Sequence, residues 1–254
     1  MSPPKDSAHS PSPPYPALSY ELFPPRNSMA EEKLWQTVRE LEHTNPDYVS
    51  VTYGASGSNR DTALDLVTRL FSETTLRPLA HLTCVASSSE DLVALVEEFV
   101  SRGVRGILAL RGDIPTDPTF PPGDLKHASE LVQLVRRFER TRTAHLGAGR
   151  LAVGVAAYAT KHPDSPNFDH DIEALLAKQE AGADFALTQV FFRSEHFDRL
   201  IKAARRAGVE IPIIPGVMPL TSVKRLNRLS ELAGIDMDYQ LRDRLAAADD
   251  DATR

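Results

Sequence analysis

Short apolar runs alternate with longer amphipathic segments along most of this chain. In the segment 90–100, the apolar residues Leu92, Leu95 and Phe99 fall on one face of a helix. The segments 172–181 and 239–248 also have a helical pattern. The runs between such segments have the length and composition of β-strands, and they comprise residues 18–23, 48–53, 79–84, 106–110, 151–158, 185–191 and 211–217.

Glycines mark the ends of three expected helices. Gly103, Gly182 and Gly208 each follow a helical pattern and shortly precede the next strand, which is the position of a helix C-cap. Because strands and helices alternate, we expect a parallel sheet. Seven units of similar spacing favour a (β/α)8 TIM barrel over an open sheet. Because no eighth unit of this kind can be recognised, we expect the eighth βα unit of such a barrel to be missing from this chain.

Composition and charge restrict the size of the domain, the class of partner and the compartment that we expect for this protein. The chain has 254 residues, 41% of them hydrophobic, which suffices for one barrel domain over residues 17–254. Residues 1–16 hold six prolines and four serines, so we expect a disordered tail there and no signal peptide. A net charge of -6 argues against a nucleic-acid partner, and no apolar run reaches the roughly 18 residues of a membrane helix. Cys84 has no second cysteine to pair with, and we expect a soluble cytoplasmic protein.

Polar residues gather where the expected strands end. Glu21 precedes Pro24 and Pro25, which cannot continue a sheet ladder. Because the carboxyl ends of parallel strands form the active-site rim of a barrel, we expect such residues to converge. They have no metal-binding motif and suit an organic cofactor or heterocycle better than a metal ion. Besides Glu21, the set comprises Thr52, Tyr53, Gly54, His81, Arg111, Gly112, Asp113, Tyr158, His162, Gln189, Pro215 and Gly216.

Seven short segments around these strand ends resemble the 5,10-methylenetetrahydrofolate reductase family in order and spacing. They are residues 20–26, 49–55, 80–84, 109–113, 155–158 with 162–163, 181–184 with 188–192, and 214–219. The resemblance implies a flavin-dependent (β/α)8 barrel of one-carbon metabolism and methionine biosynthesis. In that family, NADH or NADPH reduces FAD, and the reduced flavin passes a hydride to the one-carbon unit of the folate.

The resemblance also implies roles for individual residues. By its position, Glu21 matches the family's acid. An acid is needed because opening of the methylene-bridged ring requires a proton at the departing nitrogen. Asp113 matches the aspartate that faces the flavin and the folate pterin, and Gln189 can pair with the same heterocycle. Arg111 and Lys178 suit the FAD diphosphate, although Lys178 alone fits a solvated helix lysine equally well. The implied FAD contacts are Thr52, Tyr53, Ala55, His81, Arg111, Gly112, Asp113, Ala128, Tyr158, His162, Asp171 and Lys178.

Two departures from the family's pattern keep alternatives open. Ala174 and Ala177 stand where the family often has polar or basic residues facing FAD. The family's last strand and helix, with an arginine that helps bind folate, have no counterpart before Arg254, so either the chain is truncated or a partner covers the gap. The alternatives to the reductase are a noncatalytic flavin- or folate-binding remnant and another FAD-dependent barrel oxidoreductase, such as a proline dehydrogenase. The choice between NADH and NADPH, and between a monomer and a homo-oligomer, stays open.

Overall fold

The computed structural model describes residues 17–52, 60–113, 123–142 and 149–252. Seven parallel strands form one sheet in the sequential order β1 to β7. Every strand overlaps one of the runs expected from the sequence, so the predicted parallel sheet is confirmed. The strands are β1 (Ser19–Leu22), β2 (Tyr48–Val51), β3 (Pro78–Thr83), β4 (Gly106–Leu110), β5 (Ala152–Ala157), β6 (Phe185–Thr188) and β7 (Ile213–Ile214).

Helices join consecutive strands and extend beyond the last one. Asn27 and Asn167 cap the first and fifth of them, because each side chain accepts a backbone N–H at 2.9 Å. None of the helices in the described ranges is long and apolar enough to cross a membrane. The helices are α1 (Ser28–Glu42), α2 (Arg60–Glu73), α3 (Ser89–Ser101), α4 (Ala128–Thr141), α6 (Phe168–Glu180), α7 (Ser194–Arg206), α8 (Val223–Ala233) and α9 (Tyr239–Ala252).

The predicted glycine stops are confirmed. Gly103, Gly182 and Gly208 follow α3, α6 and α7, and all three have φ between 91° and 107°. This left-handed region is open to glycine but costly for other residues, so each helix ends where the chain turns into the next strand.

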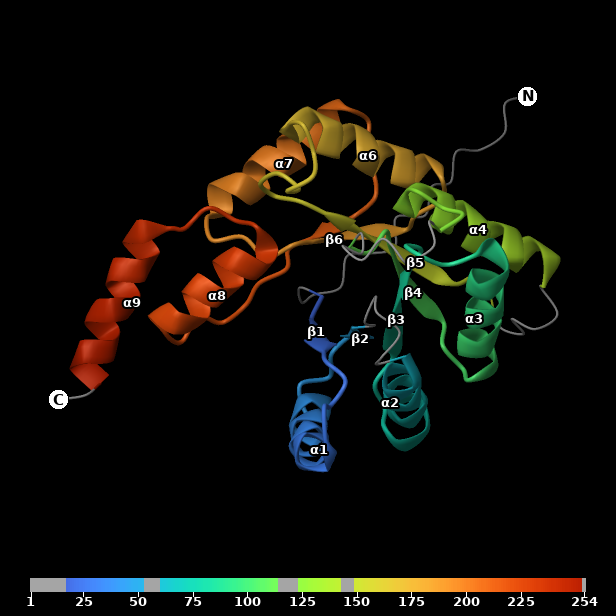
Figure 1. Cartoon of the computed structure of the whole chain (residues 1–254), viewed down its shortest axis with the longest axis horizontal. Helices are drawn as coiled ribbons and strands as arrows, with labels where there is room; N and C mark the ends of the chain where they lie inside the picture. Colours follow the sequence, from blue (N-terminus) through green and yellow to red (C-terminus); the bar gives the residue numbers. More distant parts are fainter. Residues whose placement is uncertain (1–16, 53–59, 114–122, 143–148, 253–254) are drawn as a thin grey trace, which may run out of the picture.

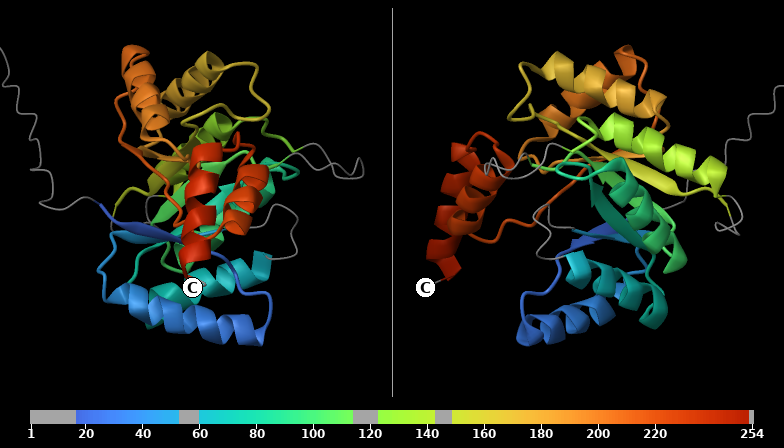
Figure 2. Two further views of the ribbon diagram at one scale, coloured as in Figure 1. Left: turned by 90° about the vertical axis from the view of Figure 1, so that its left-hand side faces the viewer. Right: turned by 45° about the vertical axis from the view of Figure 1, so that its right-hand side comes forward.

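The sheet is curled, and the helices lie on its outer side. In Figure 1, α1, α2, α3, α4, α6 and α7 form an arc around the strands in chain order. The helices α8 and α9 stand apart from this arc, as the right-hand view of Figure 2 also shows. Within the described residues, β1 and β7 each pair with a neighbour on one side. The (β/α)8 prediction is therefore confirmed as a curled, barrel-like parallel α/β fold, and the missing eighth unit stays a prediction.

Side chains of the first strands alternate between the helices and the inside of the curl. Leu22, Val51 and Leu82 are at most 6% exposed and belong to the core that the helices cover. Glu21 and His81 precede two of these residues in β1 and β3, and successive strand residues point to opposite faces. The inner face near the strand ends therefore carries an acid and an imidazole.

A buried ion cluster fastens α4 to the starts of β5 and β6. The Arg136 side chain is 8% exposed, and its guanidinium lies 2.7 Å from Glu139 Oε2 and 2.6 Å from Asp184 Oδ2. The same guanidinium donates to the backbone carbonyls of Leu151 and Gly182, each at 2.9 Å. Because its charge is paired and its donors are used, this arginine can be buried without a large desolvation penalty.

Candidate active site

Glu21, Thr52 and His81 form one group of polar residues at the carboxyl ends of β1 to β3. Glu21 is exposed, and its Oε1 accepts a hydrogen bond from Thr52 Oγ1 at 2.6 Å. The His81 side chain is 6% exposed, and its Nε2 is buried without a hydrogen-bond partner in the described part of the chain. Burial lowers the pKa of His81, although the nearby Glu21 carboxylate opposes this shift. His81 is therefore neutral near pH 7, and its Nε2 stays unpaired among the residues that the structure describes.

A second group lies at the ends of β4 and β5. Arg111 follows β4, and its Nη2 lies 2.6 Å from Asp164 Oδ2. Tyr158 follows β5, and its ring meets that of His162 edge to face, with centroids 4.6 Å apart. Burial raises the pKa of Tyr158 to about 12, so its phenol remains a hydrogen-bond donor. Burial, with Arg111 next in effect, lowers the pKa of His162.

The segment 161–165 between β5 and α6 is folded on itself and tied to α6. Lys161 Nζ donates to three backbone carbonyls of this segment at 2.6 to 3.1 Å. Asp171 of α6 accepts from the His162 N–H at 2.9 Å and from the Ser165 hydroxyl. His162 Nδ1 accepts from the Asp164 N–H at 3.0 Å, which leaves the proton of the neutral ring on Nε2.

Lys178 reaches from α6 to the end of β5. Its Nζ donates to the Ala156 carbonyl at 2.9 Å. Desolvation lowers the pKa of Lys178 to about 8; Asp171 opposes this effect, and Arg111 adds to it. The interpretation of Lys178 as a solvated helix lysine is therefore wrong, because its ammonium group is desolvated and bonded to the Ala156 carbonyl.

Gly112 and Asp113 follow Arg111 at the end of β4. Gly112 has φ of +86°, and a Cβ there would lie 2.7 Å from Val85 Cγ1, so only glycine fits without movement. Asp113 is exposed. Ala128 is 7% exposed and is the first residue of α4.

Gln189 follows β6 and is exposed. Its Oε1 accepts the Val190 N–H at 2.9 Å, so the amide NH2 is the part of the side chain that is turned to other partners. Tyr53 and Ala55, also expected at the site, lie outside the described residues.

Asp164, Lys161 and Ser165 shape the site but were not expected from the sequence. The available signal was weak: a polar turn segment that follows His162 and precedes the helix cap Asn167. Such a pattern indicates a loop, but only the contact with Arg111 shows that Asp164 faces the rim.

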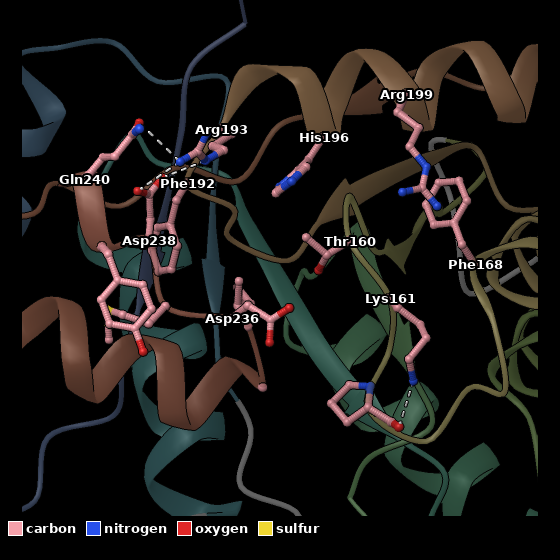
Figure 3. Close-up of a pocket in the computed structure, with 15 residues that line it drawn as sticks. Thr160, Lys161, Phe168, Phe192, Arg193, His196, Arg199, Asp236, Asp238 and Gln240 are labelled. Carbon is pink, nitrogen blue, oxygen red and sulfur yellow. Dashed lines mark hydrogen bonds and ion pairs between the residues drawn. The ribbon is translucent and has the colours of Figure 1, made fainter. Parts of the chain in front are cut away.

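A cavity of about 720 Å³ lies beside the rim (Figure 3). It is bounded by the β5–α6 connection, α7 and the α8–α9 connection. Arg193 pairs with Asp238 on one side of it at 2.8 Å, and His196 points into it from α7. None of the candidate site residues from the sequence lines this cavity. Lys161, from the β5–α6 connection next to the site, does line it. The cavity therefore borders the predicted site without coinciding with it.

The two polar groups fit a heterocycle that carries a diphosphate. His81 Nε2 is a buried polar atom without a hydrogen-bond partner among the described residues, which a polar atom of such a ring system could supply. Arg111 at the end of β4 and Lys178 beside the end of β5 supply the positive charge that a diphosphate requires.

A curled parallel sheet with an acid, imidazoles and cations at its carboxyl rim defines a barrel-type α/β enzyme. The family model described as methylenetetrahydrofolate reductase matches residues 11–254. The chain belongs to the methylenetetrahydrofolate reductase family.

Sequence comparisons with individual proteins support this assignment. The 5,10-methylenetetrahydrofolate reductase of Escherichia coli (strain K12) is 32% identical over 235 residues, which cover 92% of this chain and 75% of that protein. The enzyme of the same name from Buchnera aphidicola subsp. Acyrthosiphon pisum is 34% identical over 233 residues, with the same coverage. An uncharacterized Clostridium thermocellum protein has a similar structure, with a TM-score of 0.55 and 14% identity over 91% of this chain and 76% of that one. That structure supports the fold alone.

Proposed function

We propose that this protein reduces 5,10-methylenetetrahydrofolate to 5-methyltetrahydrofolate, with NADH or NADPH as electron donor and FAD as cofactor. The observation that carries the proposal is the convergence of Glu21, His81 and Arg111 on one rim of a sheet in a chain of this family. Glu21 lies on β1, His81 lies on β3 and Arg111 directly follows β4, and their order along the sheet is that of the family's motifs.

Positive charge and ring donors of this chain would hold the cofactor. Arg111 and Lys178 bind the diphosphate, and Tyr158 and His162 offer donors from the β5 end. His81 meets a polar atom of the ring system, and the remaining contacts come from Thr52, Gly112, Ala128 and Asp171 and from Tyr53 and Ala55. Bound FAD supplies hydride transfer between the nicotinamide and the folate.

Glu21 delivers a proton to the folate nitrogen that departs when the ring opens. Thr52 is its positioning residue, because the 2.6 Å hydrogen bond fixes one carboxyl oxygen and leaves the other for the substrate. The exposure of Glu21 suits this role, since the acid has to reach both solvent protons and the substrate.

Asp113 and Gln189 orient the folate. A carboxylate accepts hydrogen bonds from the N–H donors of a pterin edge, and Asp113 is exposed at the strand end where such an edge would lie. Gln189 contributes its amide NH2, because Val190 already occupies its oxygen.

An absorption spectrum of the purified protein, followed by anaerobic addition of NADH or NADPH, tests this proposal. We expect a flavin spectrum that bleaches with the preferred nucleotide and recovers when methylenetetrahydrofolate is added. Bleaching without recovery would point instead to another flavin-dependent oxidoreductase. A folate complex that forms without bleaching would indicate a noncatalytic binding protein.

A further inference from the structure

Arg111 is held by a carboxylate that is itself well exposed. The Arg111 side chain is 30% exposed and that of Asp164 is 59% exposed, and their atoms approach to 2.6 Å. The Arg111 guanidinium is also the main reason that the pKa of Asp164 is lowered, so the pair is charged at neutral pH. Among the described residues, Asp164 is the one carboxylate that forms an ion pair with Arg111.

A partly exposed ion pair of this kind is easily exchanged. Such pairs contribute little to stability, whereas an arginine binds a phosphate with two charge-assisted hydrogen bonds. A diphosphate that reached Arg111 would also bring negative charge close to the Asp164 carboxylate. Asp164 occupies Nη2 and the Gly112 carbonyl occupies Nε, so a diphosphate that binds the Nη2 edge of the guanidinium competes with Asp164 for this nitrogen.

The backbone of the segment 161–165 would not have to move for this exchange. Lys161, Asp171 and the His162 ring hold the segment through its backbone and Ser165, and none of these bonds uses the Asp164 carboxylate. Rotation of one exposed side chain is therefore enough to release Arg111.

We propose that Asp164 is an internal counter-ion for Arg111, which competes with the diphosphate of the cofactor and is displaced when that group binds. The inference rests on the proposed function. By this proposal, Asp164 lowers the affinity for the cofactor. The same ion pair holds the Arg111 side chain in position in the protein without cofactor.

The test uses flavin-free protein and three probes: FAD, ADP and riboflavin. ADP carries the diphosphate without the flavin, and riboflavin carries the flavin without phosphate. Dissociation constants are measured by flavin fluorescence for FAD and riboflavin, and by titration calorimetry for ADP. The variants are Asp164→Asn and Asp164→Ser, with Asp243→Asn as the matched control, because Asp243 forms another exposed pair with Arg242 at 2.8 Å on α9.

We expect both Asp164 variants to bind FAD and ADP about two- to fivefold more tightly, the range for removal of one exposed ion pair, with riboflavin affinity unchanged. The control variant should match the wild type for all three probes. Unchanged or weaker FAD binding by the Asp164 variants, while the wild type binds FAD, would overturn the inference and leave the proposed function intact. If the wild type bound neither FAD nor riboflavin, the proposed function would fail and the inference with it.

Discussion

Glu21 is the residue on which the proposed folate reduction depends most directly. Its carboxyl group lies on the inner face of β1 and is fixed by Thr52 at 2.6 Å. We expect Glu21→Gln to keep flavin reduction by the nicotinamide nucleotide, because an amide preserves the shape of the side chain but cannot deliver the proton. Reoxidation by methylenetetrahydrofolate should slow by about 10²-fold or more, the usual loss for a general acid.

Stopped-flow absorbance of the flavin separates these two half-reactions. Glu40→Gln removes the same charge from the exposed side of α1 and should leave both half-reactions unchanged. Folate-dependent reoxidation at the wild-type rate in Glu21→Gln would show that another group supplies the proton.

Lys178 should make cofactor binding depend on pH. Its free-protein pKa is about 8 because of desolvation, and a bound diphosphate would favour the charged form and raise it. Above pH 8, protein with the diphosphate bound would therefore hold one proton more than the free protein does. FAD affinity should be constant below pH 7 and fall by up to about tenfold per pH unit above pH 8, the limit for one linked proton.

Titration of flavin-free protein with FAD between pH 6.5 and 9.5 measures this profile. Lys178→Arg keeps a charge at every pH of the series and should flatten the curve. A wild-type curve that is already flat would mean that the Lys178 ammonium group does not meet the diphosphate.

At the scale of elements, the Arg136 cluster decides how firmly α4 is held against the sheet. The side chain of Arg136 is 8% exposed and serves two carboxylates as well as two backbone carbonyls. Arg136→Met would leave the Glu139 carboxylate without this partner in a poorly solvated place, whereas Asp184 would keep its pair with Arg150 at 3.0 Å. We expect the free energy of unfolding to fall by about 3–5 kcal/mol, as for other buried pairs that lose one member.

Urea denaturation followed by circular dichroism measures this change. Arg242→Met is the matched control, since Arg242 pairs with Asp243 at a side-chain exposure of 42%. Its loss should cost at most about 1 kcal/mol. Equal losses in the two variants would show that the buried cluster adds no stability beyond an ordinary surface pair.

At the scale of the whole molecule, the histidines whose pKa values are lowered couple stability to pH. Burial lowers the pKa of His81, so below the ordinary histidine pKa the unfolded chain binds a proton that the folded chain does not. Protonation therefore favours unfolding, and stability should decline as the pH falls from about 6.5 toward the folded-state pKa. The slope contributed by one histidine is at most about 1.4 kcal/mol per pH unit.

Urea denaturation of flavin-free protein between pH 5 and 8 tests this expectation. His81→Asn should flatten the acid side of the curve. His162, whose pKa is lowered mainly by burial as well, should contribute in the same direction, so the double variant should be flatter still. An acid slope that His81→Asn leaves unchanged would contradict the prediction.

The pattern of the sequence was enough to predict the elements and the rim. Strand runs, amphipathic segments and the glycines Gly103, Gly182 and Gly208 depend on local backbone preferences, so residues close in sequence determine them. The placement of polar residues at strand ends is local too, because parallel strands bring their carboxyl ends to one edge whatever the side-chain contacts. Glu21, Arg111 and Gly112 were predicted at the rim in this way.

Only the tertiary structure decided which of these groups meet and which are buried. The 2.6 Å contact between Arg111 and Asp164 joins residues 53 positions apart, and Lys178 turns inward although its sequence pattern equally fits a solvated lysine. The burial that lowers the pKa of His81 likewise comes from neighbouring elements. The physical reason is that desolvation and ion pairing depend on the full surroundings of a side chain, which distant parts of the chain supply, whereas periodicity reports only on its own segment.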